Sequence, residues 1–253
     1  MRWFVNLSYR GETFHGWQRQ PGAESVQSRL EEAFGTILRQ PVAVTGAGRT
    51  DAGVNARQMI AHLDLPDSAV PDSRMARAVN SICGPDIVVH GFAPVAPDAH
   101  ARFDATERSY RYFVHTERSP FTGPLSWHTR RPLDFDAMNR AAALLIGRRD
   151  FTSFSKLHTD VKTNICDLRR AAWHHIDGED ADRWYFEIAA DRFLRNMVRA
   201  VVGTLVDVGR GKLAPEGVLD ILGRKDRCAA GTSMPGEPLF LWTVEYPYPL
   251  VWQ

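Results

Sequence analysis

The start of the chain carries two clear hydrophobic periodicities. Apolar and polar residues alternate over residues 2–10, which predicts a strand whose covered face carries Trp3, Val5, Leu7 and Tyr9. A helical period then runs up to Pro41, with Ser25 placed to cap a helix whose apolar face is Val26, Leu30, Phe34 and Ile37. The chain is therefore expected to open with a strand and an amphipathic helix.

Two short apolar runs, residues 42–44 and 59–61, predict strands on either side of a polar, glycine-rich loop. The second of these strands is expected to continue to Leu65. Residues 72–82 have the spacing of a helix, and residues 87–92 that of a strand. Segment 91–99 contains two prolines and is interpreted as a linker between two halves of the chain.

The second half follows a similar scheme without a detectable sequence repeat. Helices are expected at residues 135–146, at 193–208, and briefly from Pro215. Strands are expected at 109–116, 168–176, 183–190 and 239–246, with a turn at 177–180. Because strands and helices do not alternate regularly, the pattern predicts an α+β fold with a mainly antiparallel sheet.

Composition narrows the class of protein. The 253 residues are 44% hydrophobic and 24% charged, which is typical of a globular protein with a sizeable core. No apolar run approaches the roughly 20 residues of a membrane span, and the N-terminus turns polar too soon for a signal peptide. The three cysteines are odd in number and far apart, so we expect neither disulfides nor a zinc site, and a cytoplasmic location.

The basic residues are almost all arginine, although the net charge is only +1. Only four of the 31 basic residues are lysine, and the planar guanidinium of arginine suits bidentate contacts with phosphate. Genome base composition is an alternative explanation for this richness. Position is more informative, because arginines gather on or near the motifs described below: Arg49, Arg57, Arg102, Arg108, Arg111 and Arg118. Such clustering on a nearly neutral protein favours a nucleic-acid-binding cleft.

The loop over residues 46–54 is the strongest chemical signal. It places one carboxylate, Asp51, among three glycines, a threonine and Arg49. Glycines allow close approach of a bulky ligand, and a neighbouring arginine favours the ionised carboxylate. The alternative is an ordinary turn in which Asp51 bonds its own backbone. An ionised Asp on a tight loop beside cations favours chemistry at a sugar carbon of a nucleic acid.

Other familiar motifs are absent. The loop lacks the third glycine of a dinucleotide-binding fingerprint and the Gly-Lys-Ser or Gly-Lys-Thr of a phosphate-binding loop. Ser153 and Lys156 match the Ser-x-x-Lys of penicillin-recognising enzymes, but neither companion motif of those enzymes is present. The neighbours His174 and His175 are expected on opposite faces of a strand, so we predict no metal site.

Several motifs in order along the chain resemble the TruA family of tRNA pseudouridine synthases. They are Gly48-Arg49-Thr50-Asp51-Ala52-Gly53-Val54, residues 9–20 with Gly16-Trp17-Gln18-Arg19-Gln20, His100-Ala101-Arg102-Phe103, Arg108-Ser109-Tyr110-Arg111-Tyr112, Asp150-Phe151-Thr152-Ser153-Phe154, and residues 193–205 with Asn196-Met197-Val198-Arg199. One departure is Asn55, where the family commonly has His.

The resemblance implies an architecture and an activity. It implies two related α/β subdomains, residues 1–104 and 105–253, with the active-site cleft between them. It implies an isomerase that converts uridine to pseudouridine at positions 38–40 of the tRNA anticodon stem-loop, without a cofactor. It also implies a homodimer. The competing class is an RNA-binding protein that performs no chemistry.

Pseudouridine formation breaks the bond from ribose C1′ to uracil N1 and rejoins the base through C5. One carboxylate suffices, because uracil leaves as a stabilised anion, and Asp51 is that carboxylate, either as nucleophile at C1′ or as base at C2′. The resemblance assigns Arg199 to hold Asp51, and the alternative is that Arg199 is a solvated charge. It assigns Tyr110 to contact the uracil, and the alternative is that Tyr110 is a tyrosine of the core. Arg49 is expected to fill the gap left by the flipped base, and Arg102 and Arg118 to bind the substrate.

Overall fold

The computed structural model describes residues 1–156, 163–178 and 182–253, and within them the chain packs as two compact units. The first unit comprises Met1–Thr106 together with Leu241–Gln253, and the second comprises Glu107–Phe240. The sequence-based boundary between residues 104 and 105 stays a prediction. The packing of the last residues of the chain with the first unit was not predicted from the sequence.

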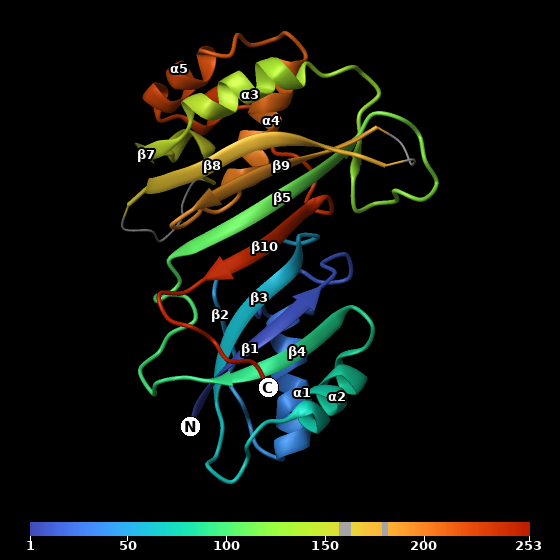
Figure 1. The fold of residues 1–253 in the computed structure, drawn as a ribbon, viewed down its shortest axis with the longest axis vertical. Helices are drawn as coiled ribbons and strands as arrows, with labels where there is room; N and C mark the ends of the chain where they lie inside the picture. The colour runs from blue at the N-terminus through green and yellow to red at the C-terminus, as the bar shows by residue number, and fades with distance from the viewer. Residues whose placement is uncertain (157–162, 179–181) are drawn as a thin grey trace. The chain divides into compact units, whose positions relative to one another are not determined.

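The first unit is an antiparallel sheet with two helices (Figure 1). Strand β1 (Arg2–Tyr9) pairs with both β3 (Asn55–Asp64) and β4 (Ile87–Pro94), and the short β2 (Thr45–Gly46) pairs with β3. Helices α1 (Val26–Leu38) and α2 (Ser73–Cys83) pack on one another, and α2 also packs on β4. The first-unit part of β10 (Leu239–Glu245) is tied to β3, where the Val244 amide donates to the side-chain oxygen of Gln58 (3.1 Å).

The second unit is built around the antiparallel order β5-β9-β8-β7. Its strands are β5 (Glu107–His115), β6 (Trp127–His128, parallel to β5), β7 (Gly147–Asp150), β8 (Ile165–Ile176) and β9 (Arg183–Ala190). Its helices are α3 (Phe135–Leu144), α4 (Met197–Gly209) and α5 (Gly217–Arg224), with short 3-10 turns at Thr152–Phe154 and Arg227–Ala229. Helix α3 packs on both β8 and α4 (Figure 1).

The predicted α+β class with a mainly antiparallel sheet is confirmed. Helix starts follow their caps: the Ser25 hydroxyl accepts from the Ser28 amide, and Asp72 and Asp134 accept from amides in the first turns of α2 and α3. The N-terminal strand and the strands at 168–176 and 183–190 are also confirmed. Residues 179–181 of the turn region lie outside the described part of the chain.

Three sequence-based predictions were wrong. Residues 42–44 are not a strand, although Val42 and Val44 are buried, because their side chains pack without backbone pairing. Residues 91–94 continue β4 and are not linker. Helix α4 begins at Met197 and not at residue 193, because Asn196 takes a left-handed conformation (φ 66°) that interrupts a helix.

The Ser-x-x-Lys match at Ser153 and the neighbouring His174 and His175 have structural explanations. The buried Ser153 hydroxyl donates to the Ile221 carbonyl and accepts from the Asp226 amide, so it fastens α5 to the 3-10 turn. His174 stacks on Tyr185, whereas His175 contacts Asp177 and Asp182. No group of three potential metal ligands lies together among the described residues, and no helix there is long and apolar enough to cross a membrane.

Candidate active site

The Asp51 loop leaves β2 and turns back into β3. Asp51 sits at its tip, where its carbonyl accepts from the Val54 amide (3.2 Å) and Gly53 takes a positive φ of 79°. Just before the tip, the Thr50 hydroxyl hydrogen-bonds the Tyr9 hydroxyl (2.8 Å). The tight turn is therefore fixed from both sides, and the Asp51 side chain is half-exposed while Arg49 beside it is exposed.

A second sequence motif, residues 9–20, packs against the Asp51 loop. The Trp17 amide donates to the Thr50 carbonyl (3.1 Å), and the Trp17 ring is buried against Gly46. Gly16 has φ +87°, and a Cβ at that position would lie 2.5 Å from the Thr50 carbonyl oxygen. Only glycine satisfies both conditions, so the two motifs that the sequence singled out form one interlocked structure.

Asn55, the residue that departs from the family pattern, is buried next to the Asp51 loop. Its side-chain oxygen accepts a hydrogen bond from the Gly11 amide (2.8 Å), and the residue is only 1% exposed. The contact joins the start of β3 to the supporting motif. Asn55 therefore forms a structural contact next to the Asp51 loop.

The motif around residues 100–103 lies in the first unit and presents an aromatic surface. Phe103 is 75% exposed, and the guanidinium of Arg102 lies 5.8 Å from its ring centre. Behind it, the Ala101 amide donates to Nδ1 of His62 (3.1 Å). Burial, then the nearby His100 and Arg2 side chains, lower the pKa of His62 to about 4, so His62 stays neutral and keeps accepting this bond at neutral pH.

Tyr110 lies in the second unit, on β5 opposite Ile188 of β9. Its ring meets Phe193 edge-to-face, with ring centres 5.1 Å apart. Tyr110 is half-buried, whereas Tyr112 and Val114 on the same face of β5 are fully buried. The core-tyrosine alternative therefore describes Tyr112 better than Tyr110.

Arg199 stands on the first turn of α4, where it is half-buried. Its Nε donates to the Met234 carbonyl, and the Met234 amide donates back to the Arg199 carbonyl (3.2 Å). The segment 231–234 crosses α4 at van der Waals distance: a Cβ at Gly203 would lie 1.8 Å from the Thr232 carbonyl oxygen. The Gly231 amide also donates to the Thr204 hydroxyl (2.8 Å). Gly203 and Thr204 of the motif at residues 193–205 therefore contact the segment that crosses α4.

The predicted site residues are divided between the two units. Asp51, Arg49 and Arg102 belong to the first unit, and Tyr110, Arg199 and Arg118 to the second. Two of the clustered arginines have local structural contacts: Arg108 donates to the Asp191 carbonyl (2.9 Å), and Arg111 lies 4.4 Å from the Tyr185 ring centre. Arg118 lines a surface cavity with His115 and His128, a grouping that the sequence pattern did not predict.

The chain is similar to known proteins that share one name. The family model described as tRNA pseudouridine synthase matches residues 141–247. A Bacteroides thetaiotaomicron protein named tRNA pseudouridine synthase A is 53% identical over 246 residues, covering 97% of this chain and 91% of the relative. Proteins of the same name from Parabacteroides distasonis (51%; 97% and 96% covered) and Bacillus subtilis (40%; 97% and 99% covered) are also similar. The chain belongs to the tRNA pseudouridine synthase A family.

Proposed function

We propose that this protein converts uridine to pseudouridine at positions 38–40 of the tRNA anticodon stem-loop, with Asp51 as the catalytic carboxylate. The observation that carries the proposal is the family relationship over 97% of the chain, in which Asp51 stands at the tip of a loop braced by a second motif of the family. The substrate position follows from the resemblance of those motifs.

The reaction accounts for every atom without a co-reactant. The C1′–N1 bond breaks, uracil leaves as an anion, the base turns, and C5 bonds to C1′; the hydrogen on C5 is then lost and N1 is protonated. Asp51 either captures C1′ or removes a proton from C2′ and later returns it. Both routes need a carboxylate that is ionised when the substrate arrives.

The remaining residues are assigned supporting roles. We propose that Asp51 and Arg49 act together with Tyr110 and Arg199 in the reaction, with Arg199 orienting Asp51 and Tyr110 contacting the uracil. The half-exposure of Tyr110 and the position of Arg199 at a rigid crossing of backbone segments support these roles. Arg49 fills the space of the flipped base, and Arg102 and Arg118 bind substrate phosphates.

The test is release of tritium from tRNA transcripts that carry [5-³H]uridine. Pseudouridine formation exchanges the hydrogen on C5, so wild-type protein is expected to release tritium from a transcript with uridines at positions 38–40. A transcript with cytidines at these positions should release none. Equal release from both transcripts would contradict the assigned positions, and tight binding without release would favour the RNA-binding class.

Substitutions of Tyr110 test whether its ring stacks on the substrate or only packs in the core. Tyr110→Phe keeps the aromatic face and should bind tRNA within about twofold of wild type, whereas Tyr110→Ala should lose stacking worth roughly 1–3 kcal/mol and bind about tenfold more weakly. Filter binding measures both affinities, and thermal unfolding checks that the variants are folded. Equal tRNA affinity in all three proteins would return Tyr110 to the core-tyrosine interpretation.

We further propose a homodimer in a reducing cytoplasm. A tRNA is large beside a 28.5 kDa chain, and a symmetric dimer could grip the elbow with one subunit while the other holds the anticodon arm. Strand β10 buries Leu239, Leu241 and Val244, which supports its interpretation as a core strand. Burial raises the pKa of the Cys83 thiol to about 11 and that of Cys166 to about 12, which suits unreactive cysteines in a reducing compartment.

Light scattering at working concentration decides the oligomeric state. The expected mass is twice 28.5 kDa, since the two-subunit grip requires both chains. A monomer with full activity on complete tRNA would remove the two-subunit proposal and leave the role of Asp51 unaffected.

A further inference from the structure

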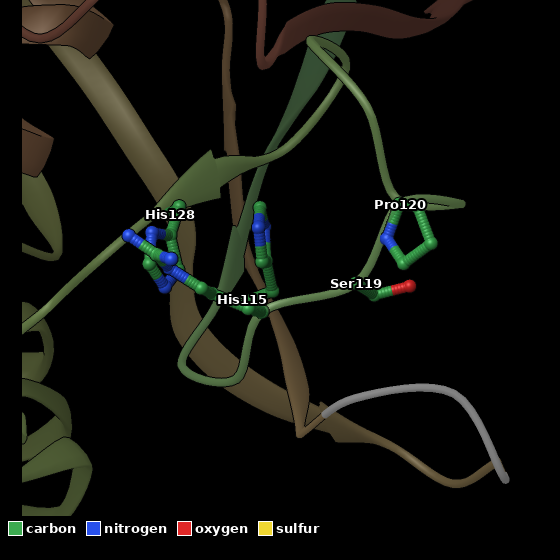
Figure 2. A pocket seen from close by; sticks show the side chains of 5 residues that line it. His115, Ser119, Pro120 and His128 are labelled. Atoms are coloured by element: carbon green, nitrogen blue, oxygen red, sulfur yellow. The ribbon is translucent and has the colours of Figure 1, made fainter.

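The second unit contains a cavity of about 330 Å³ at the end of its first strand. It is lined by His115, Arg118, Ser119, Pro120 and His128. His115 is the last residue of β5, His128 is the last residue of β6, and the two are paired across these parallel strands. The other three residues come from the loop that follows β5. Figure 2 shows the two imidazoles on one side of the cavity and Ser119 and Pro120 on the other.

The lining consists of cationic and neutral hydrogen-bonding groups. It contains a guanidinium, two imidazoles and a hydroxyl but no carboxylate. Glu117 lies on the same loop and is exposed, yet it does not line the cavity. Asp182 accepts from Thr116 (2.7 Å) and from the Trp184 indole (3.0 Å) and contacts His175 (3.0 Å), so its charge is directed at other partners. The cavity is thus suited to an anion.

The imidazoles are held in fixed positions. The His115 and His128 rings stack with centres 5.0 Å apart and an interplanar angle of 24°. Nδ1 of His115 is hydrogen-bonded to the Ser126 hydroxyl (2.9 Å). The ligands of a metal ion must converge on one point, whereas the nitrogens of stacked rings lie side by side along the ring edges. This arrangement favours hydrogen bonds to several oxygen atoms of one ligand.

The electrostatic surroundings agree. Burial, and then the charges of His128 and Arg183, lower the pKa of His115. Arg183 faces His115 across β5 and β9, and Arg118 lines the cavity itself. These two guanidinium groups create a positive potential that a bound anion relieves.

We propose that this cavity binds a backbone phosphodiester of the RNA substrate, an inference that rests on the proposed function. Arg118 supplies a two-pronged contact to two phosphate oxygens, and the imidazole edges and the Ser119 hydroxyl hydrogen-bond the same group. The Ser119 oxygen already accepts from the Phe121 amide (3.1 Å), which orders the loop and leaves its O–H to donate. A cavity of this size accommodates the phosphate together with its ribose.

Phe121 adds a second feature of an RNA contact. It is 84% exposed on the loop that supplies Arg118 and Ser119. An exposed aromatic ring beside a phosphate site is the arrangement that single-stranded RNA binders use, because a base can stack on the ring while its phosphate is held nearby. The loop therefore offers both parts of a nucleotide contact.

The double variant Arg118→Gln, His128→Asn tests the proposal, with Arg140→Gln on the exposed surface of α3 as the matched control. We expect the Kd for a full tRNA transcript to rise about tenfold in the double variant. The slope of log Kd against log salt concentration should fall by about one in magnitude, because one phosphate contact is lost. The control should change neither quantity, and thermal unfolding of all proteins confirms that they are folded.

A second readout does not depend on catalysis. In wild-type protein, titration with the dinucleotide UpU is expected to move the imidazole NMR signals of His115 and His128, and inorganic phosphate should move them more weakly. Unmoved signals, or an unchanged Kd and salt slope in the double variant, would overturn the proposal. Response to inorganic phosphate alone would also overturn it, since the site would then serve a free anion. Failure of wild-type protein to release tritium would instead refute the proposed function.

Discussion

Replacing Asp51 by alanine is expected to abolish pseudouridine formation and to leave tRNA affinity within a few-fold of wild type. The carboxylate is the group that engages the sugar, so its loss should lower the rate by at least about 10⁴-fold. The backbone of the loop should persist, because its hydrogen bonds come from the Thr50 and Asp51 carbonyls and the Thr50 hydroxyl. Tritium release under single-turnover conditions measures the rate, and filter binding measures the affinity.

Two further variants sharpen this test. Asp51→Asn keeps the size of the side chain and removes its charge, so it should be as inactive as the alanine variant. Asp98→Ala removes an exposed carboxylate elsewhere in the first unit and should retain wild-type activity. Unchanged pseudouridine yield from either Asp51 variant would rule out this residue as the catalytic carboxylate.

Gly16→Ala is expected to have the second-largest effect, although the residue carries no chemistry. A Cβ would lie 2.5 Å from the Thr50 carbonyl oxygen, and the backbone has φ +87°, so the loop must move to admit a methyl group. Clash and backbone strain together should lower the free energy of unfolding by about 2–4 kcal/mol. A shift of the Asp51 loop by about 1 Å should also slow the reaction roughly 100-fold.

Gly22→Ala is the matched control for this substitution. Gly22 has a similar positive φ of 71°, but a Cβ there would meet nothing within 4 Å. Its replacement should cost only about 1 kcal/mol of backbone strain and leave activity unchanged. Chemical denaturation and tritium release compare the two variants. Equal effects on activity would show that the close approach of Gly16 does not position Asp51.

Much of the fold could be predicted because local signals agreed with the final packing. Ser25 and Asp72 combine capping chemistry with apolar periodicity, and both start helices where expected. The start of α4 was misplaced because residues 193–196 continue the apolar spacing of the helix. The left-handed conformation of Asn196, whose side chain donates to the Ser233 hydroxyl (2.6 Å), depends on a residue distant in sequence.

In the candidate site, too, some features depend on residues that are neighbours in the sequence, and others depend on residues that are distant in the sequence. The Asp51 loop could be singled out from its own residues, because glycines, arginine and a lone carboxylate stand together. The brace from Gly16 and Trp17 could be associated with it only through family resemblance. The cavity at His115 and His128 could not be foreseen, because it depends on parallel pairing of β5 with a strand of two residues.

The measurement that tests the central claim most directly is tritium release by the purified wild-type protein from a [5-³H]uridine-labelled tRNA transcript. The protein alone, without added metal or cofactor, is expected to release tritium in an amount equal to the uridines at positions 38–40. Mapping should then find pseudouridine at those positions. No release above that of the Asp51→Ala variant, from a transcript that the wild-type protein demonstrably binds, would contradict the assignment of this chain as a pseudouridine-forming enzyme.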